Sequence, residues 1–157
     1  MPTDPTFRQT LDRRKRQSTL QLLFKAARLV NERALERVRA QSPGIDVRPA
    51  HTALFPHIDL DGTRITTLAA RTGITKQAVG QLVDDLEGMG LVHRVPDPSD
   101  GRARLVCFTD PGRQALLHGL GVLTTLQAEL GLAIGPDRMD ALHEALTALL
   151  AELEGPT

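Results

Sequence analysis

The 157-residue sequence contains one cysteine, four phenylalanines, and no tryptophan or tyrosine. A single cysteine cannot form a disulfide within the chain, and the zinc sites that several cysteines build are excluded. With so few aromatic side chains, the protein lacks the stacking platforms with which many single-strand binders hold unpaired bases. The N-terminus has no apolar run followed by a cleavage site, so we expect a cytoplasmic protein rather than a secreted one.

The residues that are present predict one globular domain with an aliphatic core. Hydrophobic residues make up 41% of the chain and charged residues 24%. The formal net charge is zero, but residues 1–40 carry 10 basic and 4 acidic groups, whereas residues 110–157 carry 2 and 7. Such asymmetry is typical of a protein that turns one surface toward a polyanion and keeps acidic groups on another.

Hydrophobic periodicity and turn residues divide the chain into an arm, several helices and one hairpin. Residues 1–10 include two prolines and no periodicity, which predicts a flexible N-terminal arm. The rest, 11–157, is expected to form a single domain. We expect helices over 11–39, 48–58, 65–73, 75–89, 109–134 and from 136 onward, with a hairpin between 91–95 and 104–109.

The two ends of the chain predict a homodimer. The helix from residue 11 carries apolar side chains on two faces, and one small core cannot bury both. The last helix repeats its apolar residues at spacings of 3, 4, 3 and 4, as a coiled-coil seam does. This seam consists of Met139, Leu142, Leu146, Leu149 and Leu153.

Residues 65–91 have the spacing of a helix-turn-helix. Ala69 and Gly73 are small enough for two helices to cross steeply, and Val79 follows six residues after the glycine. We expect the space beneath the turn to be filled by Leu68, Ile74, Val79 and Leu82. An ordinary helical hairpin that stops at glycine is the alternative interpretation.

The second helix of this unit has an outward face suited to the major groove. Its N-terminal half presents hydrogen-bonding side chains and a glycine that permits close approach, which predicts contacts to base edges. The acidic residues of its C-terminal half require the helix to enter the groove tip first. The predicted contact residues are Thr75, Lys76, Gln77, Gly80 and Gln81.

The hairpin after this helix is basic at positions where a wing can reach DNA. Arg94, Arg102 and Arg104 lie beside a turn-rich segment, and we expect them to contact phosphates or the minor groove. Asp97 and Asp100 would repel DNA if unpaired. We therefore expect these two carboxylates to support the wing internally, Asp100 by pairing with Arg102 or Arg94.

Two segments resemble the MarR (multiple antibiotic resistance regulator) family of winged helix-turn-helix regulators: KQAVGQLVDDLEGMGLVHR from residue 76 and DPSDGRARLVCFTDPGR from residue 97. The resemblance extends over about 15–154. It implies a mainly α fold with a β-hairpin wing, in which 11–45 and 110–154 are dimerisation helices and 48–109 is the DNA-binding lobe. It also implies a homodimer that binds a pseudo-palindromic operator in double-stranded DNA, usually as a ligand-responsive repressor. Gly101 departs from the family, in which many members carry arginine there.

The resemblance further implies a cavity for a small-molecule effector between the dimerisation helices and the DNA-binding lobe, with aromatic acids such as salicylate as a common class. The residues expected to line it are Phe24, Arg28, His51, Phe55 and His57. We expect no cofactor and no metal, because the six-residue spacing of the two histidines fits no ligand motif. We interpret Cys107 as a structural residue, since the chain has no second cysteine to resolve an oxidised form.

Two other functions are compatible with these patterns. A winged-helix module could bind acidic protein partners without binding DNA. A small metal-dependent enzyme is disfavoured, because the sequence contains no legible nucleophile with its base, carboxylate pair or phosphate-binding glycine loop. The long apolar stretch 115–134 is interrupted by Gln127 and Glu129, so we expect a buried helix and no membrane association.

Overall fold

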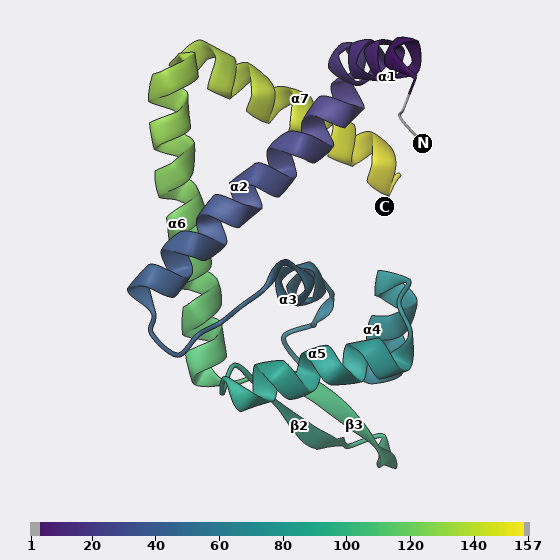
Figure 1. The fold of residues 1–157 in the computed structure, drawn as a ribbon. Coiled ribbons are helices and arrows are strands. Elements are labelled where there is room, and N and C mark those ends of the chain that lie inside the picture. The colour runs from purple at the N-terminus through teal and green to yellow at the C-terminus, as the bar shows by residue number, and fades with distance from the viewer. Residues whose placement is uncertain (1–3, 156–157) are drawn as a thin grey trace.

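The computed structural model describes residues 4–155 and is mainly helical, with one small antiparallel sheet (Figure 1). This confirms the predicted winged helix-turn-helix fold class. In chain order the elements are α1 (Pro5–Gln17), α2 (Thr19–Gln41), α3 (Pro49–Leu54), the 3-10 helix η1 (Phe55–His57), β1 (Thr63–Arg64), α4 (Ile65–Thr72), α5 (Lys76–Gly88), β2 (Val92–Asp97), β3 (Asp100–Phe108), α6 (Asp110–Ile134) and α7 (Pro136–Glu154).

The N-terminal region differs from the expected arm followed by one long helix. Residues 5–10 are the first turns of α1, and residues 1–3 of the expected arm lie outside the described residues. The Asp4 side chain accepts a hydrogen bond from the Thr6 backbone N–H, and Pro5 occupies the first helical position, so both residues start a helix. Ser18 then interrupts the helix with extended backbone angles and caps α2.

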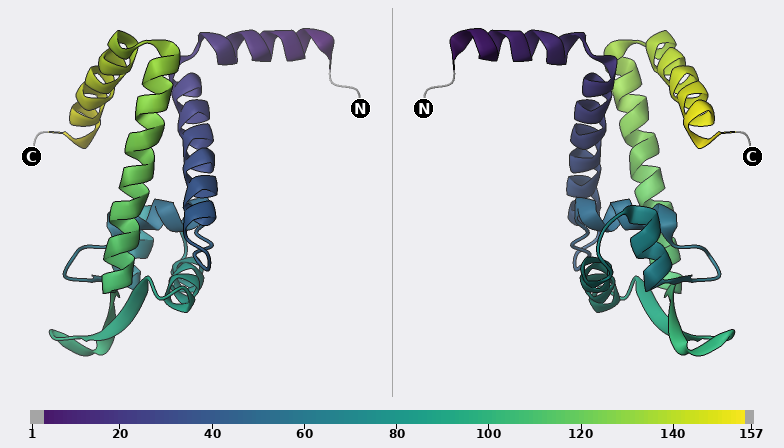
Figure 2. Two further views of the ribbon diagram at one scale, coloured as in Figure 1. Left: turned by 90° about the vertical axis from the view of Figure 1, so that its left-hand side faces the viewer. Right: turned by 90° about the vertical axis from the view of Figure 1, so that its right-hand side faces the viewer.

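Two long helices form a stalk above the compact lobe that contains α3, α4, α5 and the sheet (Figure 2). Ala34 of α2 packs on Val122 and Leu126 of α6. Arg37 and Glu129 add a bidentate ion pair with N–O distances of 2.9 and 2.6 Å between the same helices. The C-terminal half of α2 is therefore fixed to α6, and the N-terminal half extends beyond this contact.

The lobe has its own aliphatic core. Leu68, Val79, Val83, Leu86 and Val106 are all fully buried in it. The sheet has the order β1-β3-β2, with β3 between two antiparallel neighbours. The two-residue strand β1 was not expected, because it is too short to show an alternating pattern in the sequence.

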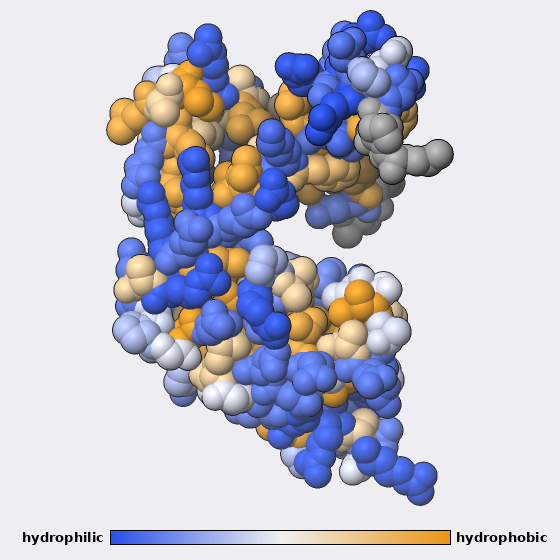
Figure 3. Space-filling model, in the orientation of Figure 1, coloured by the Kyte–Doolittle hydropathy of each residue, from blue (hydrophilic) through white to orange (hydrophobic). Residues whose placement is uncertain are grey.

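Helices α6 and α7 leave much apolar surface exposed. No residue of α7 is buried, and Leu142, Leu150 and Leu153 are 45%, 54% and 73% exposed. Figure 3 shows apolar groups at the surface of this upper part, whereas the wing tip is hydrophilic. By length and composition alone α6 could cross a membrane. The expected buried helix over 115–134 is wrong for most of this stretch, because Leu117, Leu120 and Leu132 are largely exposed within the subunit and only Val122 and Leu126 pack against Ala34 of α2.

Gly112 in the first turn of α6 is required by a close approach to the lobe. A Cβ atom at this position would lie 1.8 Å from the carbonyl oxygen of Leu91, whereas one at Gly121 would meet no atom within 4 Å. We expect Gly112→Ala to lower the free energy of unfolding in urea by about 3 kcal/mol, because backbone must move to relieve the overlap. Gly121→Ala is the control and should be neutral or stabilising by up to about 1 kcal/mol. Equal stability of the two variants would show that α6 does not approach Leu91 so closely.

Candidate nucleic-acid interface

The turn between α4 and α5 is built as a helix-turn-helix requires. Gly73 ends α4 in the left-handed conformation with φ of +70°, which glycine adopts without strain. The Thr75 hydroxyl caps α5 by accepting a hydrogen bond from the Ala78 N–H at 3.2 Å. Leu68 is buried beneath the turn as expected, but Ile74 is 41% exposed and does not fill it. Val79 is fully buried as expected, and Leu82 packs partly buried against the same core.

The outward side of α5 carries the predicted contact residues. Lys76, Gln77 and Gln81 are exposed, and so is the capping residue Thr75. Gly80 lies between them, and a Cβ atom there would have no neighbour within 4 Å. The first two turns of α5 therefore present one cationic and two amide side chains around Gly80, which has no side chain of its own. Such a surface can approach and hydrogen-bond to base edges in the major groove.

The acidic half of α5 is neutralised from within the lobe, which the sequence did not reveal. Arg94 forms ion pairs with Glu87 and, at 2.7 Å, with Asp84. Its backbone N–H also donates to Glu87 at 2.8 Å. The prediction that Arg94 contacts DNA therefore needs correction, because its guanidinium is occupied in fixing β2 to α5.

Asp85, the remaining acid, is held by the residue that caps α3 and by one residue within α3. Arg48 forms an ion pair with it, and Nε2 of the fully buried His51 lies 3.3 Å from the same carboxylate oxygen. The His51 Nδ1 accepts from the Arg48 backbone N–H at 3.1 Å, so the proton on the other ring nitrogen faces Asp85. This arrangement joins α3 directly to α5.

The turn of the wing is organised around the buried Asp97. This carboxylate accepts hydrogen bonds from the Ser99 backbone N–H and hydroxyl at 2.8 and 2.7 Å, and from Arg64 Nε at 2.6 Å. Arg64 belongs to β1, so the wing is connected to the start of α4. Asp97 thus has the supporting position that the sequence predicted, and Arg64 is a partner that the sequence did not identify.

At the tip of the wing, Asp100 accepts a hydrogen bond from the Arg102 backbone N–H at 3.1 Å rather than pairing with an arginine side chain. Arg102 and Arg104 are exposed. Within residues 4–155, neither guanidinium forms an ion pair. Both cations are therefore available to phosphate groups.

Comparison with known proteins agrees with this geometry. Residues 46–103 match the model of the MarR family. The transcriptional repressor CouR, in a structure bound to a 23-mer DNA duplex, is 29% identical over 86% of this chain and 94% of its own, with a TM-score of 0.62. The chain is therefore similar to the MarR family over the part that contains α3, α4, α5 and most of the wing. No curated protein matches it.

Two further structures share the fold of this chain. RV1404 from Mycobacterium tuberculosis is 24% identical over 90% of this chain and 98% of its own, with a TM-score of 0.69. CouR from Rhodococcus jostii RHA1 bound to p-coumaroyl-CoA is 22% identical over 86% and 93%, with a TM-score of 0.60.

The acid sensitivity of the wing follows from Asp97. Hydrogen bonds from the Ser99 hydroxyl and backbone, and then from Arg64, lower the pKa of Asp97 to about 2. Because the pKa is near 3.9 in the unfolded chain, these bonds stabilise the wing fully above about pH 4, and the stabilisation is lost as the pH falls toward 2. We expect NMR chemical shifts of Ser99 and Arg64 in the folded protein to titrate with a midpoint near the lowered pKa of about 2. In Asp97→Asn this transition should be absent, and a wild-type titration near pH 4 would contradict the assignment.

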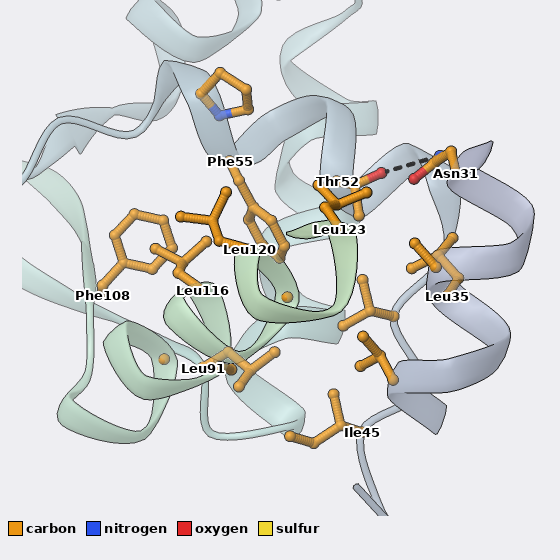
Figure 4. Close-up of a pocket in the computed structure, with 17 residues that line it drawn as sticks. Asn31, Leu35, Ile45, Thr52, Phe55, Leu91, Phe108, Leu116, Leu120 and Leu123 are labelled. Atoms are coloured by element: carbon orange, nitrogen blue, oxygen red, sulfur yellow. Dashed lines mark hydrogen bonds between the residues drawn. The ribbon is translucent and has the colours of Figure 1, made fainter. Parts of the chain in front are cut away.

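A cavity lies where the C-terminal half of α2, helices α3 and α6, and the lobe converge (Figure 4). The rings of Phe55 and Phe108 meet edge to face in it, with centroids 6.0 Å apart. The lining residues are Asn31, Ala34, Leu35, Val38, Ile45, Val47, Thr52, Phe55, Pro56, Leu91, Phe108, Gly112, Ala115, Leu116, Gly119, Leu120 and Leu123.

Of the five residues predicted to line this cavity, only Phe55 does so. Phe24 is 65% exposed in the N-terminal half of α2, and Arg28 pairs with Glu32 along that helix. His51 faces Asp85 instead, and His57 lies in η1 outside the lining. The prediction placed the cavity too close to the start of α2. The sequence did contain a signal for the α2 part of the lining, because Asn31, Ala34 and Val38 continue the same periodic face of that helix.

Cys107 lies half-buried on β3, and burial raises the pKa of its thiol. A raised pKa lowers the fraction of reactive thiolate. A Cβ atom at Gly62 would lie 2.4 Å from the Cys107 sulfur, so the thiol packs closely on the loop before β1. Among residues 4–155, no group of three histidine, cysteine or acidic side chains is arranged to hold a metal ion.

Proposed function

We propose that this protein is a cytoplasmic, homodimeric repressor that binds a pseudo-palindromic operator in double-stranded DNA and releases it when a small molecule occupies the cavity. Similarity to the MarR family over residues 46–103, and to the DNA-bound repressor CouR, supports the general assignment to DNA-binding transcriptional regulators. The observation that carries the proposal is the distribution of charge on the lobe. Lys76, Arg102 and Arg104 are exposed, whereas the acids of α5 are paired inward.

The wing and α5 lie together at the end of the molecule opposite α1 and α7 (Figures 1 and 2). A helix in the major groove and a wing on the adjacent backbone are the standard contacts of this architecture. In a two-fold dimer the two α5 helices would enter successive major grooves. The operator would then have half-site centres about 10 bp apart.

The dimer is supported by the opposite charges of the terminal helices. Helix α1 carries five basic residues and one acidic residue, and α7 carries five acidic residues and one basic residue. Neither helix buries a residue within the subunit, and the two point to opposite sides of the stalk in Figure 2. Across a two-fold axis, α1 of one subunit and α7 of its partner would be complementary in charge and would cover each other's apolar residues.

Helix α3 offers a route from cavity to DNA. Thr52 and Phe55 at its C-terminal end line the cavity, while Arg48 and His51 at its N-terminal end hold Asp85 of α5. A ligand that displaces α3 would therefore shift α5, together with the wing strand that Arg94 fixes to it, relative to α2 and α6. Because a two-fold dimer needs its two α5 helices at the spacing of successive major grooves, we propose that occupancy of the cavity lowers operator affinity.

The salt dependence of binding tests DNA recognition against the alternative of a module that binds only proteins. Replacing Arg102 and Arg104 together by alanine removes four cations per dimer, so the slope of log K against log salt should flatten by roughly 3 to 4 on any duplex. Arg33→Ala on α2 removes an exposed cation outside the lobe and should leave the slope unchanged. Absence of duplex binding by the wild-type protein at low salt would favour the protein-binding module.

A further inference from the structure

The cavity is unusual in having no charged residue in its lining. It has a volume of about 430 Å³, within the range of pockets that hold small molecules. Fifteen of its seventeen lining residues are apolar, glycine or proline, and the other two are Asn31 and Thr52. A carboxylate in this space would lose its hydration without gaining a cationic partner, which strongly disfavours binding of the charged form.

The two polar residues form one polar end of the cavity. The Asn31 amide nitrogen lies 3.4 Å from the Thr52 hydroxyl oxygen, and this hydroxyl donates its proton to the Pro49 carbonyl at 2.9 Å. Figure 4 shows this pair at one edge of the cavity and apolar side chains around the remainder. The Asn31 amide retains a second N–H and its carbonyl oxygen, so it can both donate to and accept from a neutral ligand group.

We propose that the cavity binds an uncharged, mainly apolar molecule with one hydroxyl or carbonyl group at its end, and that it discriminates against carboxylates. This inference rests on the proposed function, of which it names the effector class. It replaces the expectation of an aromatic acid, because the basic residues expected beside such an acid, Arg28 and His57, lie outside the lining. The apolar lining supplies affinity, and Asn31 fixes the orientation of the polar group.

A matched pair of probes tests the ligand class on the full chain. 1-Decanol and decanoate have the same chain length, and at pH 8 the acid is fully ionised. We expect decanol to raise the melting temperature and to bind, by calorimetry, at least tenfold more tightly than decanoate. In Asn31→Leu, decanol affinity should fall about fivefold to tenfold, as expected for one lost hydrogen bond. Decanoate binding as tightly as decanol would overturn the inference.

Two glycines of α6 locate the binding site. Gly119 lines the cavity and Gly121 does not, and a Cβ atom would meet no neighbour within 4 Å at either position. We expect Gly119→Leu to fill the cavity and to lower decanol affinity at least tenfold without unfolding the protein, whereas Gly121→Leu should bind as the wild type does. Equal binding by both variants would show that decanol binds elsewhere and would overturn the proposed site.

Operator binding is measured separately and distinguishes this inference from the proposed function. If decanol binds as described but operator affinity is unchanged, the ligand class is supported and the proposed regulation fails. If the protein binds DNA but neither probe binds, the ligand class fails and DNA recognition is unaffected. In that outcome the apolar lining is covered by protein rather than by a ligand, for example by side chains of a second subunit.

Discussion

Replacing Leu142 and Leu153 of α7 by aspartate should convert the protein to a monomer and lower its affinity for operator DNA by at least about 100-fold. Both side chains are apolar and largely exposed within the subunit, on a helix with no buried residue. Carboxylates in an apolar interface would be desolvated without partners. The loss of DNA affinity follows because the second recognition helix and wing would no longer be held at high effective concentration.

Sedimentation velocity measures the change in assembly, and fluorescence anisotropy with an operator duplex measures the change in affinity. Leu60→Asp is the matched control, because Leu60 is 78% exposed but lies on the lobe, away from α7. It should leave both the dimer and the DNA affinity intact. A double variant that remains a dimer with unchanged operator affinity would exclude α7 from the interface.

The reading of operator sequence should depend on Gln77 and Gln81. Each side chain is an exposed amide on the first turns of α5, and an amide can form a bidentate contact with adenine. We expect Gln77→Ala to cost about 1–3 kcal/mol on the operator, and the double variant with Gln81→Ala to cost more. Affinity for scrambled DNA and the salt slope should stay nearly constant, because no charge is removed.

Selection of bound sequences from a random pool measures this effect directly. The wild-type protein should enrich a two-fold symmetric motif, and the double variant should lose information at the same positions in both half-sites. Gln114→Ala, which removes an exposed amide from α6 outside the lobe, is the control. An enriched motif without two-fold symmetry, or one unchanged in the double variant, would show that α5 does not read the bases.

Local patterns in the sequence were sufficient to predict the helix-turn-helix and its wing. Gly73, Thr75 and Thr109 mark helix ends through conformations and caps that depend on residues only a few positions away. The α1–α2 break was missed, although Asp4 and Ser18 are both capping residues. Apolar residues on both sides of this break resemble one continuous helix, so periodicity concealed the interruption.

The chain by itself therefore determined the order of the elements from α3 onward apart from β1, the exposed tip of α5 and the basic wing. Only the tertiary structure decided which charges remain available to DNA. Arg94 is separated from Glu87 by seven residues and from Asp84 by ten, and their pairing depends on how β2 packs against α5. The position of the cavity was likewise decided by the packing of α2, α3 and α6. Periodicity identifies the apolar face of each helix, but the space that remains between three such faces depends on where they cross.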